Sequence, residues 1–197
     1  MSMFRTSWVG VVAAASFFLA ASGAHAIGPS ALTASSKLRP LTIAVRDATL
    51  APYAFVKFCV ANASDCADAH GAAMLPLSST LMRHLRQVNA KVNGAIVPQL
   101  DTDGDDEWQA DVTAGDCEDY ALTKRRRLIA LGWSANALRM AIAYTPDGSG
   151  HAVLVVSTSR GDLVLDNRNN SIRNWRDTDL RWVMIQSPVN PLFWNQI

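Results

Sequence analysis

The sequence lacks a large net charge, internal repeats, low-complexity segments and, after residue 26, any apolar run that could cross a membrane. Its 18 Lys and Arg residues nearly balance 17 Asp and Glu residues, which leaves a net charge of +1 at pH 7. This balance gives no support to binding of nucleic acid or of an anionic membrane surface. We expect residues 27–197 to fold as one domain, because their length and apolar content suffice for a single core.

An apolar stretch opens the chain. Arg5 precedes a short apolar core from Trp8 to Ala21, and Ala24-His25-Ala26 has the small-x-small form of a signal-peptidase site. Because this core is shorter than a membrane span, the pattern predicts a cleaved secretory signal over residues 1–26. An uncleaved N-terminal anchor is the alternative. Cleavage would leave an exported protein with no membrane span.

Cysteine is scarce, with three residues in the chain. Cys59 and Cys66 are separated by a loop-like stretch, and in an oxidising compartment such a pair can close a small disulfide loop. Two free buried thiols are the alternative. Pairing these two leaves Cys117 alone, and an odd cysteine in an exported protein is a candidate reactive thiol.

Two helices are predicted in the first half of the mature chain. Residues 51–61 carry aromatic and apolar side chains at helical spacing and predict a short helix that ends at the cysteine loop. Ser78 is typical of an N-cap and precedes an amphipathic series at i, i+4, i+7 and i+11, namely Leu81, Leu85, Val88 and Val92. Gly94 and Pro98 are expected to end this second helix.

The last third of the chain changes from helical periodicity to the alternation of β-strands. We expect four strands, over residues 138–144, 151–157, 162–167 and 181–187. Helices followed by an antiparallel meander predict an α+β fold, with N-terminal helices packed on a C-terminal antiparallel sheet.

A third helix is predicted from about Asp116 to Leu131, with Cys117 in its first turn. Lys124 to Arg127 fall in its later turns, where the helix dipole favours positive charge. The free amide groups of a first turn stabilise a thiolate, and they can also hold the oxyanion that forms when a thiolate attacks a carbonyl. A lone helical cysteine is more often a small core residue, so position alone does not decide its role.

His151 and Asp166 are the candidate base and orienting group for this cysteine. His151 opens one predicted strand, and Asp166 closes the next. If Ser157 faces Asp162 across the connection, Asp166 lies on the same face as His151, one diagonal step away. A three-residue turn would separate the pair. A surface histidine and a turn-forming aspartate are the alternative interpretations.

Acidic residues surround the cysteine. Asp116, Glu118 and Asp119 would raise the pKa of the thiol by repulsion. They are either acidic partners of a helix N-terminus or ligands of a hard cation, and calcium suits clustered carboxylates outside the cytoplasm.

The acidic loop from Asp101 to Asp105 does not match an EF-hand, because its glycine stands fourth and its twelfth residue is Val112. It is nevertheless a possible source of a further ligand from Asp105, Asp106 or Glu107.

At these residues the chain resembles the bacterial transglutaminase-like cysteine proteases, which include the LapG-type periplasmic proteases. The matching blocks run through most of the mature chain, and the most specific are residues 115–121, 124–125, 150–154 and 165–167. The resemblance implies a papain-like α+β fold in which Cys117 is the nucleophile, His151 the general base and acid, and Asp166 the orienter. It also implies that Asp116, Glu118 and Asp119 bind calcium.

The same resemblance implies a periplasmic enzyme that cleaves a protein such as a surface adhesin under control of an inner-membrane receptor. One departure is expected, because the segment between Val97 and Cys117 is short and Glu107-Trp108 stands where an Asp-x-Trp element belongs. The leading hypothesis is therefore a calcium-dependent cysteine endopeptidase. The alternatives are an acyltransferase with the same three residues and a catalytically silent calcium-binding module.

Overall fold

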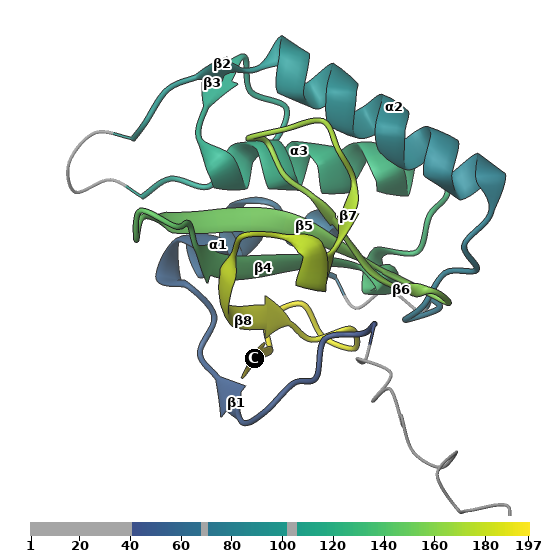
Figure 1. Ribbon diagram of the computed structural model, residues 1–197. Helices are drawn as coiled ribbons and strands as arrows, with labels where there is room; N and C mark the ends of the chain where they lie inside the picture. Colours follow the sequence, from purple (N-terminus) through teal and green to yellow (C-terminus); the bar gives the residue numbers. More distant parts are fainter. Residues whose placement is uncertain (1–40, 68–70, 102–105) are drawn as a thin grey trace, which may run out of the picture. The chain divides into compact units, whose positions relative to one another are not determined.

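The computed structural model describes residues 41–67, 71–101 and 106–197 (Figure 1). The predicted secretory signal, residues 1–26, lies outside them. Within these three ranges, none of the helices has the length and apolarity needed to cross a bilayer.

Three α-helices form as the sequence predicts, namely α1 (Tyr53–Ala61), α2 (Ser79–Ala95) and α3 (Cys117–Ala130). The Ser78 hydroxyl accepts a hydrogen bond from the Leu81 amide at 3.1 Å, which confirms the predicted N-cap of α2. Helix α2 continues through Gly94 to Ala95. Figure 1 shows α3 between α2 and the sheet, so the helix that carries Cys117 has packed neighbours on two sides.

The main sheet is antiparallel, in the order β1-β9-β8-β4-β5-β6-β7. The four predicted strands are confirmed as β4 (Leu138–Tyr144), β5 (Gly150–Thr158), β6 (Gly161–Leu165) and β8 (Arg181–Gln186). The sequence did not predict three short strands, β1 (Ala48–Thr49), β7 (Arg173–Asn174) and β9 (Trp194–Gln196). Helices packed on an antiparallel sheet confirm the predicted α+β class.

A separate parallel pair holds the segment before the cysteine. Strand β2 (Val97–Pro98) pairs with β3 (Ala114–Gly115), and the Gln99 amide donates to the Gly115 carbonyl at 2.9 Å. The chain therefore enters α3 from a hydrogen-bonded strand.

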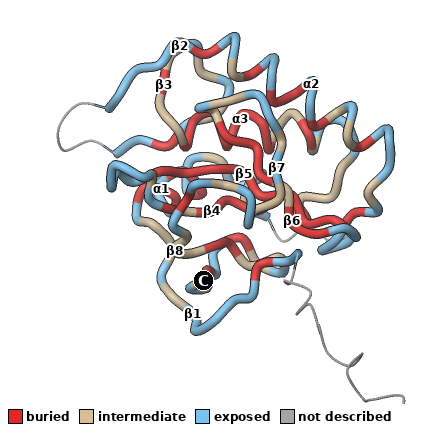
Figure 2. The backbone as a smooth tube through the Cα atoms, viewed as in Figure 1, coloured by how far each residue is buried: buried red, intermediate tan, exposed pale blue. Residues whose placement is uncertain are grey.

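Both faces of the central sheet are buried (Figure 2). One face, with Met140 and Leu154, packs against the helices, and the opposite face, with Val153 and Val155, packs against residues including Ile43. This alternation follows from the two-residue period of a strand. His151 and Asp166, at the ends of neighbouring strands, are thus attached to the rigid centre of the fold.

Two of the basic residues in α3 are not dipole partners at the surface, so the sequence interpretation was wrong for them. Lys124 is 0% exposed and Arg125 4% exposed. Arg125 donates to the Leu138 carbonyl at 3.0 Å and to the Asp65 carbonyl at 2.7 Å. Asp65 belongs to the loop closed by the predicted disulfide, which the structure confirms between Cys59 and Cys66.

Candidate active site

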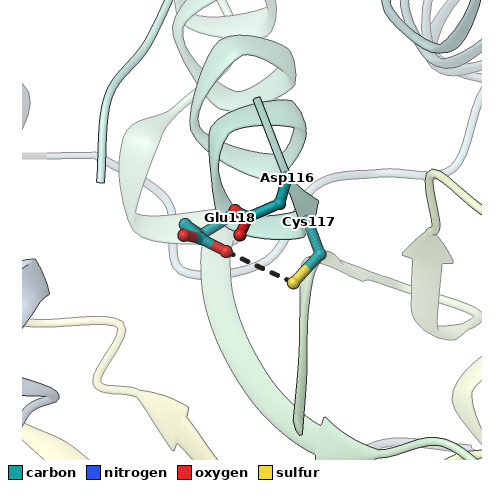
Figure 3. A group of neighbouring side chains, drawn as sticks. All are labelled: Asp116, Cys117 and Glu118. Atoms are coloured by element: carbon teal, nitrogen blue, oxygen red, sulfur yellow. Dashed lines mark hydrogen bonds between the residues drawn. The ribbon is translucent and has the colours of Figure 1, made fainter. Parts of the chain in front are cut away.

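Cys117 is the first residue of α3, with Asp116 as its N-cap. The Ala152 amide donates to Sγ at 3.2 Å, and the thiol donates to Glu118 Oε2 at 3.3 Å (Figure 3). Among the described residues it is the one free cysteine, and it is half-buried. Burial, followed by the charge of Glu118, raises the pKa of the thiol well above its ordinary value. These surroundings favour the neutral thiol, so the formation of a thiolate needs a base close by.

Gly115 allows α3 to begin where it does. A Cβ atom at this position would overlap the carboxylate of Asp119, which folds back beneath the helix N-terminus. The chain therefore approaches closely before Cys117. This close approach lets the backbone of Gly115 pack against the side chain of Asp119.

His151 is buried and pairs with Asp166, with Nε2 3.0 Å from Oδ1. It lies in β5 beside Ala152, whose amide contacts the cysteine sulfur. With Nε2 bound to a carboxylate, Nδ1 is the ring nitrogen left for proton transfer. The structure thus brings all three predicted residues to one place.

Asp166 reaches His151 through the predicted strand register. Ser157 pairs with Asp162 and Leu154 with Leu165, so the next residue of the chain, Asp166, comes onto the face of His151. The connection is tighter than assumed, because one further pair, Thr158 with Gly161, closes it to two residues.

Arg168 is a site residue that the sequence did not reveal. Its Nε and Nη2 donate to Asp166 Oδ2 at 3.0 and 2.9 Å, and its amide donates to Oδ1 at 2.9 Å. Burial acts to raise the pKa of Asp166, but hydrogen bonds from His151 and Arg168 outweigh it and hold that pKa well below its ordinary value. Asp166 therefore stays ionised and accepts from His151. An arginine in a turn has no pattern that would identify this role.

Two cavities meet at the cysteine and the histidine. The larger, of about 780 Å³, has largely apolar walls that include Leu50, Pro52, Trp108 and Met184. The smaller, of about 350 Å³, is lined by Leu100, Tyr120 and Arg168 among others. Cys117, Gly150 and His151 line both cavities. Both cavities can therefore hold parts of a bound chain next to the sulfur.

Acidic side chains form two overlapping groups beside the sulfur. One consists of Asp116, Cys117 and Glu118, and the other of Asp101, Asp106 and Glu118; within each group the ligand atoms lie within 4.8 Å of one another. Asp116 Oδ1 is buried without a hydrogen-bond partner among the described residues. Burial, followed by the hydrogen bond with Asp116, raises the pKa of Glu118 to about 9. Clustered carboxylates, one of which has a buried oxygen without a partner, fit a hard cation.

The acidic groups that the structure brings together differ from the predicted set of calcium ligands in two places. Asp119 lies outside both groups, because its Oδ1 accepts from the Gln109 amide at 2.7 Å, and burial raises its pKa to about 6. Asp101 was not predicted, whereas Asp106 was named only as one loop candidate. Of the other candidates in that loop, Asp105 lies outside the described residues and Glu107 lies outside both groups.

The sequence was expected to depart from the family pattern at residues 107–108, and this expectation was wrong. Asp106 Oδ1 accepts a hydrogen bond from Trp108 Nε1 at 2.9 Å, so Asp106-Glu107-Trp108 supplies the Asp-x-Trp element. Trp108 is buried against Phe55 of α1, with ring centroids 5.7 Å apart. The tryptophan holds the acidic loop on the core and brings Asp106 toward Glu118.

Residues 45–197 match the family model described as bacterial transglutaminase-like cysteine proteinase. The chain belongs to this family. Similar solved structures are those of Legionella pneumophila LapG. The calcium-bound form is 27% identical with a TM-score of 0.49, and the match covers 53% of this chain and 64% of that one.

The EGTA-treated form of Legionella LapG is 28% identical with a TM-score of 0.47, over 53% of this chain and 62% of that one. This family member therefore spans less than two thirds of the length of the LapG chains that it matches. No curated protein sequence gives a significant match.

Proposed function

We propose that this family member is a cysteine endopeptidase in which Cys117 is the nucleophile, His151 the general base and acid, and Asp166 the orienting carboxylate. The observation that carries the proposal is the 3.0 Å contact between His151 Nε2 and Asp166 Oδ1, beside a cysteine sulfur that accepts from the next amide of β5. A nucleophile, a base and an orienter within one cavity are the groups that covalent acyl transfer requires.

The chemistry proceeds in two halves. His151 takes the thiol proton, the sulfur attacks a peptide carbonyl, and the collapse of the tetrahedral intermediate breaks the C–N bond as His151 returns the proton to the leaving amine. His151 then takes a proton from water as the water attacks the thioester; the C–S bond breaks, the acid is released, and His151 returns the proton to the sulfur of Cys117. The free amides of the first turn of α3 are the donors nearest the sulfur in sequence and are suited to hold the oxyanion.

Cleavage within a chain is favoured over removal of terminal residues. The two cavities, of about 780 and 350 Å³, extend from the same Cys117, Gly150 and His151. An endopeptidase needs room for substrate on both sides of the scissile bond. The apolar side chains of both cavities give an extended segment surface to pack against.

We further propose that the acidic groups bind Ca²⁺ through Asp101, Asp106, Asp116 and Glu118. The unpaired Asp116 Oδ1 and the buried, shared Glu118 support this set, and all four residues offer the hard oxygen ligands that calcium prefers. When bound, the ion would neutralise carboxylates that otherwise oppose a negative charge on the sulfur.

Export to the periplasm, a surface adhesin as substrate and an inner-membrane receptor as regulator remain proposals. Their support is the signal-like pattern of residues 1–26 and the family resemblance.

The test is to compare the exported proteins of cells that carry the wild type or Cys117→Ala. A cleavage product is expected to vanish in the variant while its melting temperature stays at the wild-type value. Adding a labelled primary amine to the purified enzyme and the substrate so identified separates hydrolysis from acyl transfer, because transfer incorporates the label. Undiminished cleavage by Cys117→Ala would refute the proposal.

A further inference from the structure

Lys124 is a buried cation to which the proposed chemistry gives no role. It is 0% exposed, and within residues 41–67, 71–101 and 106–197 its Nζ has no hydrogen-bond partner. The Tyr120 ring lies beneath it, 5.9 Å from Nζ to the ring centroid. Burial lowers the pKa of Lys124 to about 7, whereas the charge of Asp166 acts in the opposite direction. An ammonium buried without acceptors is unfavourable, so acceptors should lie nearby.

Three unpaired acceptors border the segment that carries Asp166. They are the side-chain amide oxygens of Asn89, Asn93 and Asn167, each buried without a hydrogen-bond partner among the described residues. Asn93 Nδ2 donates to the Asp166 carbonyl at 3.0 Å, and Asn89 Nδ2 donates to the Asn169 carbonyl at 3.3 Å. Asn167 follows Asp166 directly in the chain. All three acceptors thus belong to residues that form or hold residues 166–169.

The unpaired donor hydrogens and the unpaired acceptors match in number. An ammonium carries three donor hydrogens, and each of the three amide oxygens accepts. Helices α2 and α3, which carry Asn89, Asn93 and Lys124, pack against each other, and the Asp166 carboxylate is close enough to act on the lysine charge. A buried water can bridge donors and acceptors that do not meet directly.

We propose that Lys124 is a positioning residue of the active site: its ammonium donates through buried water to the amide oxygens of Asn89, Asn93 and Asn167, and so holds residues 166–169 in place. The proposal rests on the proposed function, because Asp166 matters for catalysis only if His151 is the base. Residues 166–169 carry Asp166 and its partner Arg168, so a shift of this segment would turn the imidazole away from the sulfur. Misplacement by about 1 Å can lower a rate about 100-fold.

Lys124→Met tests the role, because methionine fills similar volume without the charge. Removing a poorly compensated buried charge should leave the melting temperature unchanged or higher. Two signals should nevertheless deteriorate. The downfield NMR resonance of the His151 Nε2–H, which reports its bond to Asp166, should broaden or disappear. The rate of Cys117 alkylation by iodoacetamide, at fixed pH with calcium present, should fall about 10-fold or more.

Lys91→Met is the matched control, since it removes an exposed lysine from α2 and should change neither signal. A folded Lys124→Met protein with wild-type resonance and alkylation rate would overturn the proposal. If that variant does not fold, Lys124→Leu, which likewise removes the donor, is judged by the same two outcomes. A wild-type Cys117 that resists iodoacetamide would instead refute the proposed function, and the resonance would still decide the role of Lys124.

Discussion

The two sides of the candidate site differ in how completely their polar groups are satisfied. On the histidine side, Asp166 accepts from His151 and from Arg168, and its pKa is held well below the ordinary value. On the cysteine side, burial raises the pKa of both Cys117 and Glu118, and Asp116 keeps an unpaired buried oxygen among the described residues. One side is complete within the protein, whereas the other accumulates negative groups without a positive partner.

This difference teaches where control of the activity should lie. A base with its orienter already in place needs no further partner to accept a proton. A cysteine surrounded by carboxylates becomes reactive only when their charge is compensated. We therefore expect changes on the histidine side to lower the rate of turnover, and changes among the acids to alter how the protein responds to calcium and to pH.

The largest effect is expected from Asp166→Asn. Both carboxylate oxygens accept hydrogen bonds, so one of them must become an NH₂ group that faces a donor. The two bonds from the Arg168 guanidinium are the stronger set, and the NH₂ group should therefore face His151 and force its proton onto Nδ1. Cleavage should fall about 10⁴-fold, measured on the substrate that the Cys117→Ala comparison identifies. Retention of a tenth of the wild-type rate would contradict this account.

Gly150→Val is expected to narrow the space beside Gly150, which lines both cavities. A Cβ atom at Gly150 would meet no atom of the described residues within 4 Å, and this glycine does not have a positive φ, so valine should fold normally. Cleavage of the protein substrate should fall about 100-fold, whereas the small reagent iodoacetamide should alkylate Cys117 at nearly the wild-type rate. Gly94→Ala, equally free of contacts but outside both cavities, is the control. Equal losses of cleavage and of alkylation would contradict the idea that the substrate chain occupies the space beside Gly150.

Arg168→Met should have a smaller effect, because Asp166 keeps its bond to His151 and the bond from the amide of residue 168. We expect an approximately tenfold loss of cleavage from looser positioning of the carboxylate. In the Asp166→Asn background the same change should restore part of the activity, since the amide can then turn its oxygen toward His151. Asp179→Asn removes only the exposed outer partner of Arg168 and should change little. Absence of any rescue would show that Arg168 does not set the orientation at 166.

The smallest effect is expected from Glu118→Gln and concerns stability. The folded protein raises the pKa of Glu118 from 4.5 to about 9, so its carboxyl favours the folded state fully below pH 4.5, and that contribution is lost as pH rises from 4.5 toward 9. In the presence of a chelator, the melting temperature of the wild type should therefore decline between pH 5 and pH 8.5 more than that of Glu118→Gln does. The difference between the two declines should be about 3 °C or larger.

Calcium should reduce this decline in the wild type but not in Glu118→Gln. Adding calcium near pH 7 should also release protons from the wild type, which calorimetry in buffers of different ionisation enthalpy measures. Glu107→Gln changes an exposed acid in the loop that carries Asp106, and it should behave as the wild type does. Identical pH profiles for wild type and Glu118→Gln would remove Glu118 from the proposed calcium ligands.

Local patterns were sufficient for most of the fold. The Ser78 cap and the apolar stripe of α2 are set by residues within one or two turns, and β4 lies where alternation predicts it. The pairing of β5 with β6 was also predictable, because a short connection leaves few registers. Strands β1 and β9 were not predicted, since they are short and pair with each other from distant parts of the chain.

The sequence by itself determined the order of helices and strands, the position of Cys117 at a helix start, and the strand ends that carry His151 and Asp166. Hydrophobic period, capping and turn length act between near neighbours, and a single sequence displays them directly. Only the tertiary structure decided that Arg168 holds Asp166, that Asp101 and Asp106 join Glu118, and that Lys124 is buried. Hydrogen bonding, shared charge and burial at these residues depend on which segments pack together, which no local pattern specifies.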